Sequence, residues 1–205
     1  MKYFLRNKKV IFITGDRKGE TSSVVDFVCK HNFSVLHIGS IPGVFDIPKI
    51  LKNEIIIFED NENISTGEIR NFLNALPKAV FIITQAEKKS RIKRLLLHFP
   101  ERWLLVVDFS IAGKLRGKKT RKMLTFGINK KKADFFITDI NQKESETNFK
   151  VNYKSNIIPF WISEKLKKKE VYSILPALCV AETLSLNLAE VSFRVKEKLK
   201  SFTNG

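Results

Sequence analysis

The chain has 205 residues, and its hydrophobic content of 43% is enough for one large domain or two small ones with a buried core. Lysine and arginine outnumber aspartate and glutamate by 37 to 21, so the formal charge of +16 favours polyanionic partners such as nucleic acid. Lysine runs at 130–132 and 167–169 suit solvated turns, so a generally lysine-rich composition explains the excess equally well. Two cysteines argue against a disulfide framework, and no apolar stretch suits a signal peptide or a membrane span, which together predict a cytoplasmic protein.

Apolar runs of strand length alternate with helical patterns along the first part of the chain, which is typical of a β/α fold with a mainly parallel sheet. The runs consist mostly of Val, Ile, Leu and Phe, as expected when helices cover both faces of the sheet. The predicted strands are 10–14, 35–38, 54–59, 79–84 and 103–108, and the predicted helices are 21–30, 48–51, 67–76 and 90–98. Ser65 and Glu68 fit a capping box at the start of the third of these helices.

Beyond residue 127 the pattern changes to alternating, β-rich runs that are joined by polar turns. Strands at 133–140, 147–153 and 157–163 are predicted to form an antiparallel meander, and helices at 171–184 and 188–200 to close the chain. The predicted fold class is therefore α/β: a P-loop-type three-layer sandwich with a mainly parallel sheet, an antiparallel meander and two C-terminal helices.

A glycine-containing loop lies between the first predicted strand and the first predicted helix. Backbone amides and the positive end of a helix dipole bind phosphate at such a place, while a lysine and a hydroxyl usually complete the contacts with phosphate and Mg²⁺. The candidate nucleotide-binding residues of the loop are Gly15, Lys18, Gly19, Thr21 and Ser22, and the hydroxyl of Thr21 is also a candidate Mg²⁺ ligand.

Glu20 departs from this pattern, because the position after Gly19 usually carries the lysine. Two unit charges about 4 Å apart interact by roughly 4 kcal/mol at an effective dielectric constant of about 20, so a carboxylate here is expected to repel a triphosphate and to remove much of the affinity of the site. Lys18 or Arg17 could supply the positive charge, although neither has the usual spacing. The hydroxyls at 21 and 22 also suit ordinary helix caps, so the loop alone leaves both a structural turn and an ATP site open.

Three further groups of residues are weighed as site candidates. Glu59 ends the third predicted strand, beside Asp60, at the sheet edge where open α/β sheets bind ligands; a Mg²⁺ ligand and a solvated loop start explain it equally well. The three histidines, at 31, 37 and 98, show no metal-like pairing and are expected at the surface or at helix ends. The basic segment 110–122 could contact phosphates, but it has no aromatic residue in its interior and is expected to be a solvated loop.

Several short motifs, spread over nearly the whole chain, follow one another in an order shared with a known family. They are TGDRKGETS at 14–22, Glu59 followed by Gly-Glu-Ile at 67–69, MLTFGIN at 123–129, Ala-Asp-Phe at 133–135, TNFKV at 147–151 and the helical segment 171–181. In this order they resemble the central, ATP-binding domain of Mur ligases, most of all the type that adds D-alanyl-D-alanine to the UDP-N-acetylmuramoyl tripeptide.

The resemblance implies a domain that binds MgATP and activates a substrate carboxylate as an acyl phosphate, which an amine then attacks. It also implies that Asp108 lies near the adenine. Asp108 is the one residue of the corresponding family motif that is kept here, and Val106 stands in place of the asparagine of that motif. Residues 85–87, Gln-Ala-Glu, stand where the family has an asparagine, a glycine and a Mg²⁺-binding histidine. Lys89 is a candidate for the family's carbamylated lysine, although a helix surface is a sufficient reason for a lysine there.

On this resemblance, residues 1–205 form one domain, with a β/α nucleotide-fold part at 1–127 and the antiparallel strands and closing helices at 128–205; the family's N- and C-terminal domains are expected to be absent. The predicted function is that of a divergent or incomplete ATP-dependent amide ligase of peptidoglycan precursor synthesis, with catalytic residues that the sequence does not identify. Its partners would be a nucleotide, and a UDP-linked muropeptide or separate chains that supply the missing domains. The alternative is a non-enzymatic basic module that binds nucleic acid or another polyanion on a degenerate P-loop fold.

Overall fold

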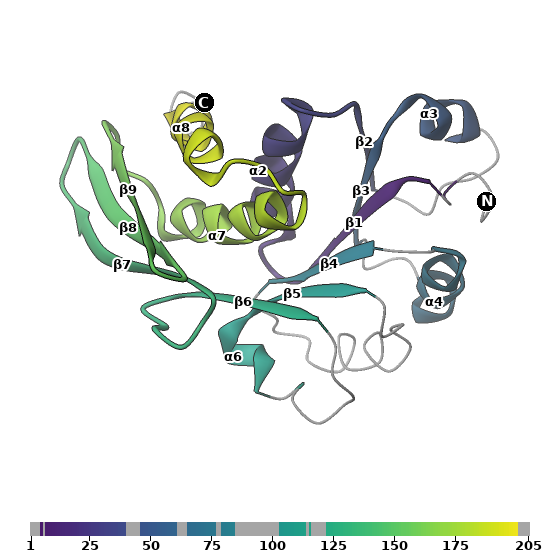
Figure 1. Cartoon of the computed structure of the whole chain (residues 1–205), viewed down its shortest axis with the longest axis horizontal. Coiled ribbons are helices and arrows are strands. Elements are labelled where there is room, and N and C mark those ends of the chain that lie inside the picture. The colour runs from purple at the N-terminus through teal and green to yellow at the C-terminus, as the bar shows by residue number, and fades with distance from the viewer. Residues whose placement is uncertain are drawn as a thin grey trace.

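The computed structural model describes residue 5 and residues 7–39, 46–60, 65–76, 79–84, 103–113, 115 and 122–200. The described strands form one nine-stranded sheet in the order β2-β3-β1-β4-β5-β6-β7-β8-β9 (Figure 1). The strands are β1 (Lys9–Thr14), β2 (Val35–Ile38), β3 (Ile55–Glu59), β4 (Ala79–Ile83), β5 (Leu104–Asp108), β6 (Met123–Ile128), β7 (Phe135–Gln142), β8 (Thr147–Tyr153) and β9 (Asn156–Ile162). The helices are α2 (Lys18–Lys30), α3 (Ile47–Lys52), α4 (Thr66–Ala75), α6 (Phe109–Ala112), α7 (Lys168–Thr183) and α8 (Leu188–Lys200).

Neighbouring strands from β2 to β7 run parallel, whereas β7, β8 and β9 pair antiparallel. The five strands predicted in the first part of the chain are all confirmed, with bounds that agree within about one residue, well inside the usual uncertainty of strand ends. Their near-continuous apolar composition corresponds to burial on both faces of the sheet.

The predicted antiparallel meander is confirmed, because β8 pairs antiparallel with both β7 and β9. β6 was not predicted as a strand, yet it extends the parallel sheet from β5, and β7 pairs parallel with it. The change of direction therefore falls between β7 and β8. Gly127 lies inside β6 because a Cβ there would be 2.8 Å from Cγ of Lys130, and such close approach is a common reason for glycine in a strand.

Two of the helices begin three residues earlier than the sequence pattern indicated. α2 begins at Lys18, so Glu20 belongs to its first turn, where a carboxylate interacts favourably with the positive end of the helix dipole. α7 begins at Lys168, so Lys168 and Lys169 lie on a helix and not in the solvated turn that was expected. The short helix α6 occupies the start of the expected basic loop; the rest of that loop, apart from residues 113, 115 and 122, lies outside the described residues, as do the predicted helix 90–98 and residues 85–89.

Helices cover both faces of the parallel sheet, so the predicted three-layer α/β class is confirmed. Side chains of β1 alternate between two buried clusters: Ile11 and Ile13 pack with residues of α2, α7 and α8, while Val10 and Phe12 pack with residues of α3 and α4. Figure 1 shows the same division, with α2, α7 and α8 on one side of the sheet and α3 and α4 on the other.

Two smaller expectations have clear outcomes. The capping box that opens α4 is present, since the amide of Ser65 donates to Oε2 of Glu68 at 3.0 Å and the amide of Glu68 donates to Oγ of Ser65 at 3.2 Å. Within the described part of the chain, no helix is long and apolar enough to cross a membrane.

Candidate functional site

The loop between β1 and α2 lies at the carboxyl edge of the parallel sheet. β1 is an interior strand, with β3 on one side and β4 on the other, so this loop opens where α/β sheets bind ligands. Gly15 has a φ of 110°, a backbone conformation that residues with a side chain rarely adopt, so a glycine is required to turn the chain from strand into helix.

Hydrogen bonds fasten this loop to the neighbouring strand ends. The amide of Lys18 donates to the carbonyl of Gly15 at 3.3 Å, and the amide of Arg17 donates to Oγ1 of Thr84, at the end of β4, at 3.3 Å. Thr84 is itself held to Thr14 by bonds from its amide and its hydroxyl. Because two loop amides are used within the chain, an anion bound here would depend more strongly on charged side chains.

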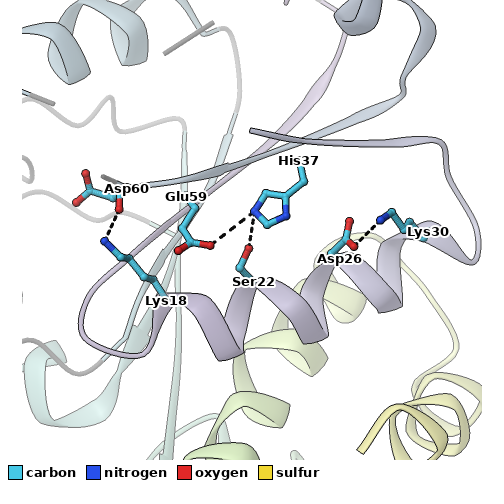
Figure 2. A network of polar contacts seen from close by, with 7 residues as sticks. All are labelled: Lys18, Ser22, Asp26, Lys30, His37, Glu59 and Asp60. Carbon is cyan, nitrogen blue, oxygen red and sulfur yellow. Dashed lines mark hydrogen bonds and ion pairs between the residues drawn. The ribbon is translucent and has the colours of Figure 1, made fainter. Parts of the chain in front are cut away.

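A pocket of about 430 Å³ lies at this edge and is lined by Lys18, His37, Gly39, Glu59 and Asp60. Nζ of Lys18 donates to the carbonyl oxygen of Asp60 at 2.5 Å, which holds the ammonium beside the carboxyl end of β3 (Figure 2). The side chain of Glu59 is 25% exposed. The structure therefore brings two predicted site residues, Lys18 and Glu59, into one pocket.

His37 belongs to the same pocket, although its sequence context predicted a place at the surface or at a helix end. Its Nε2 lies 2.8 Å from Oγ of Ser22 and 3.6 Å from Oε2 of Glu59. Figure 2 shows the imidazole between the helix α2 and the end of β3. The missing signal was strand order: β2 pairs with β3, which puts the ends of these two strands side by side.

Glu20 is paired with a cation from a distant part of the chain. Its Oε1 lies 2.7 Å from Nζ of Lys169 in the first turn of α7, 149 residues away in sequence. The hydrogen bond from Lys169 lowers the pKa of Glu20, and the backbone amide of Glu20 itself lowers it further, against the opposing effect of burial. The carboxylate is therefore charged, and its charge is compensated by Lys169, a contact that the loop sequence alone did not indicate.

The remaining polar groups of the loop lie deeper. Thr21 is fully buried, does not line the pocket, and its hydroxyl has no hydrogen-bond partner among the described residues. The carboxylate of Asp60 is 4% exposed and accepts a bond from the Thr14 hydroxyl at 2.7 Å. Of the neighbouring carboxylates Glu59 and Asp60, only Glu59 thus has an accessible side chain to offer to a cation.

Asp108 lies at the end of β5, two strands away from β1, and does not line the pocket. Its carboxylate accepts hydrogen bonds from the Tyr172 hydroxyl at 2.5 Å and from the Ser110 amide at 2.8 Å. The guanidinium of Arg17 stacks on the Tyr172 ring, 4.9 Å from its centre. Asp108 is therefore connected to the loop through a tyrosine of α7.

Within the part of the chain that the structure describes, no group of three or more His, Cys, Asp and Glu side chains could hold a metal ion. Mg²⁺ does not require such a cage, because it keeps several waters and is commonly bound through one or two carboxylates plus phosphate oxygens. The accessible carboxylate of Glu59 fits that manner of binding.

Comparisons with known proteins agree with the fold. No protein-family model and no curated protein matches the sequence. Solved structures do match, and they define the class: the chain has the fold of Mur ligases, as the resemblance predicted.

Three such structures represent the matches. The first is MurF ligase from Thermotoga maritima in complex with ADP, with a TM-score of 0.74 and 20% identity over 95% of this chain and 50% of that one. The second is MurF from Acinetobacter baumannii, with a TM-score of 0.71 and 16% identity over 95% and 47%. The third is a pseudomurein peptide ligase type C from Methanothermus fervidus, with a TM-score of 0.65 and 13% identity over 96% and 50%. This chain thus spans about half the length of the ligases it matches.

Proposed function

We propose that this chain binds ATP with Mg²⁺ at the pocket beside the loop between β1 and α2. The observation that carries the proposal is the meeting of Lys18 and Glu59 in one pocket, next to a glycine loop that follows an interior strand. The fold is that of ligases, one of which was solved with ADP.

The residues of the pocket fit a nucleotide with its magnesium ion. Lys18 offers an ammonium near the start of α2, where the helix dipole also favours anions. Glu59 offers a partly exposed carboxylate, an oxygen ligand of the kind that Mg²⁺ prefers. Glu20 opposes phosphate less than its position alone indicates, because Lys169 compensates its charge.

The other predicted ligands have different support. Gly15 turns the chain from β1 into α2 with its positive φ, and Gly19 in the first turn of α2 borders open space, since a Cβ there would meet no atom within 4 Å. Ser22 reaches the pocket through its contact with His37. Thr21 and Asp108 do not line the pocket, and their proposed roles as Mg²⁺ ligand and adenine contact rest on the sequence motifs.

The reaction we propose is ATP-dependent amide-bond formation, in which ATP supplies the phosphoryl group that activates a carboxylate for attack by an amine. The finer assignment to the D-alanyl-D-alanine-adding type, with a UDP-linked muropeptide as substrate, rests on the motifs of the sequence. The proposed cytoplasmic location rests on the low cysteine content and on the apolar pattern of the sequence. In this proposal, residues 1–205 correspond to the central domain, with parts 1–127 and 128–205, and the rest of the active site is supplied by other domains or separate chains. The substitutions at 20 and 106 are the reason to expect a divergent catalyst.

Calorimetry with ATP, with and without Mg²⁺, tests the nucleotide site. Lys18→Ala is expected to weaken ATP binding about tenfold to a hundredfold, the usual value of a hydrogen bond to a charged group. Lys30→Ala is the matched control, since it removes the same charge from the opposite end of α2, where Lys30 pairs with Asp26 at 2.7 Å. Equal affinities of the two variants, or no binding of ATP or ADP to the folded protein, would contradict the proposal.

Two further variants distinguish the contribution of Mg²⁺ to ATP binding from that of the charges near the phosphates. Glu59→Gln is expected to remove most of the difference between affinities measured with and without Mg²⁺, and to leave the Mg²⁺-free affinity nearly unchanged. Glu20→Lys is expected to strengthen ATP binding, because it adds a positive charge in the first turn of α2. A Glu20→Lys protein that stays folded but binds no more tightly would show that this turn does not face the phosphates.

A further inference from the structure

The antiparallel strands β7, β8 and β9 are covered by helices on one face. Along β9 the side chains of Phe160 and Ile162 are buried in the cluster that includes α7 and α8. The alternate residues Ile157, Pro159 and Trp161 are exposed, because successive side chains of a strand point to opposite faces. In Figure 1 no described helix lies over this outer face of the three strands.

Trp161 is the most prominent side chain of the outer face. It is 70% exposed, the highest value among the large hydrophobic residues that are exposed in the described chain. Asn148 and Lys150 of β8 pair in register with Trp161 and Pro159, so an amide and an ammonium lie beside the indole on the same face. The face thus combines one exposed aromatic ring with polar hydrogen-bonding groups.

The outer face is held in a fixed shape by its own polar contacts. Nδ2 of Asn152 donates to Oγ1 of Thr138 at 3.0 Å and to the carbonyl oxygen of Phe136 at 3.4 Å, which ties β8 to β7. Lys150 pairs with Asp139 at 2.9 Å, but both side chains are more than half exposed, so solvent screens this pair strongly.

Exposed lysines lie in the chain segments beyond both ends of these three strands. The turn before β7 carries exposed lysines at 130–132, and the segment after β9 carries exposed lysines at 165, 167 and 168. None of these six forms an ion pair with another described residue. The seven residues of β9 extend for roughly 20 Å, long enough for a few nucleotides between the two groups of positive charge.

We propose that the outer face of β7, β8 and β9 binds single-stranded nucleic acid. Trp161 would stack on a base, as aromatic side chains do in single-strand binding proteins, while the flanking lysines contact phosphates. The chain's charge of +16 is complementary to such a partner. A protein partner suits the face less well, because the apolar strip is one strand wide and lysine is depleted in the cores of protein interfaces.

Tryptophan fluorescence tests the stacking directly. The chain has two tryptophans, of which Trp103 is 1% exposed and Trp161 is 70% exposed. Addition of an unstructured twelve-nucleotide oligo-dT or oligo-U at low salt is expected to quench the Trp161 emission. The Trp161→Phe protein retains only the buried Trp103 and is expected to lose the quenching while it still binds.

The affinity is measured by the fluorescence anisotropy of a labelled oligonucleotide. Trp161→Ala is expected to weaken binding at least tenfold, whereas Phe193→Ala, which removes a 65% exposed aromatic ring from α8, is the matched control and is expected to change nothing. The logarithm of the affinity is expected to fall linearly with the logarithm of the salt concentration, and Lys150→Gln to reduce that slope.

Three outcomes would overturn the proposal. The first is equal affinity of the Trp161→Ala and wild-type proteins. The second is tighter binding to a duplex of the same length than to the single strand. The third is concentration-dependent self-association, measured by sedimentation, that Trp161→Ala abolishes in a protein that binds no oligonucleotide, which would make the face a contact between copies of this chain. Because this face shares no residue with the nucleotide pocket, failure here leaves the ATP titrations unaffected.

Discussion

The two parts of the sheet differ in how their faces are covered. In the parallel part both faces are buried under helices, so its polar groups gather at the strand ends, around Lys18, His37 and Glu59. In the antiparallel part only one face is covered, and polar and aromatic side chains lie along the strands themselves. The difference shows that the coverage of a sheet decides whether its accessible polar groups gather at an edge or lie along a face.

The largest difference in stability is expected between a substitution in the interior of the parallel part and one on the outer face of the antiparallel part. Phe12 is fully buried and stacks on Phe58 and Phe81 with ring centres 4.9 and 4.5 Å away. Phe12→Ala is expected to lower the free energy of unfolding by about 3–5 kcal/mol, because it leaves a cavity between these rings. Trp161→Ala is expected to change the same quantity by less than about 0.5 kcal/mol.

Urea denaturation followed by circular dichroism measures both variants. A Trp161→Ala protein as unstable as Phe12→Ala would mean that the outer face is packed in the folded protein and is not a free surface.

An intermediate loss of stability is expected when either of two tyrosines that donate hydrogen bonds to carboxylates is replaced by phenylalanine. Tyr172 donates to the buried Asp108 in the parallel part, whereas Tyr153 donates to Glu182, whose side chain is 32% exposed, in the antiparallel part. Tyr172→Phe is expected to cost about 1–3 kcal/mol of unfolding free energy, because water does not readily replace the lost donor at Asp108. Tyr153→Phe is expected to cost less, since water reaches Glu182.

Thermal unfolding of the two variants under one buffer condition makes this comparison. A cost for Tyr153→Phe that equals or exceeds that of Tyr172→Phe would indicate that solvent does not reach Glu182 and would remove the proposed contrast.

The smallest expected effect concerns the ion pair between α2 and α7. Since the pKa of Glu20 is lowered in the folded protein, the stability it contributes is present above its ordinary pKa and is lost as the pH falls through the lowered value. Glu20→Gln is therefore expected to be less stable than the wild type at neutral pH, by under about 1 kcal/mol for a solvent-screened pair. Unfolding titrations from pH 7 down to pH 3 should show the two proteins converge, and a constant difference would mean that the pair with Lys169 does not form.

The elements of the parallel part were readable from the sequence because burial on both faces demands unbroken apolar runs, as in β1 and β3. β6 escaped this pattern because two of its positions serve other contacts. The amide and the hydroxyl of Thr125 both donate to Oδ2 of Asp134 at 2.7 Å, and Gly127 makes room for Lys130. Such polar and small residues interrupt the apolar run, so local composition alone does not predict the strand.

The candidate site shows the same division between local and long-range information. Local pattern was sufficient to select Lys18 and Glu59, because a loop after a strand and a carboxylate at a strand end are defined by neighbouring residues. Strand order and helix packing are contacts between distant segments, so only the folded chain brought His37 to Glu59 and Lys169 to Glu20. The same long-range packing left one face of β9 uncovered, a property that alternation along the strand permits but does not require.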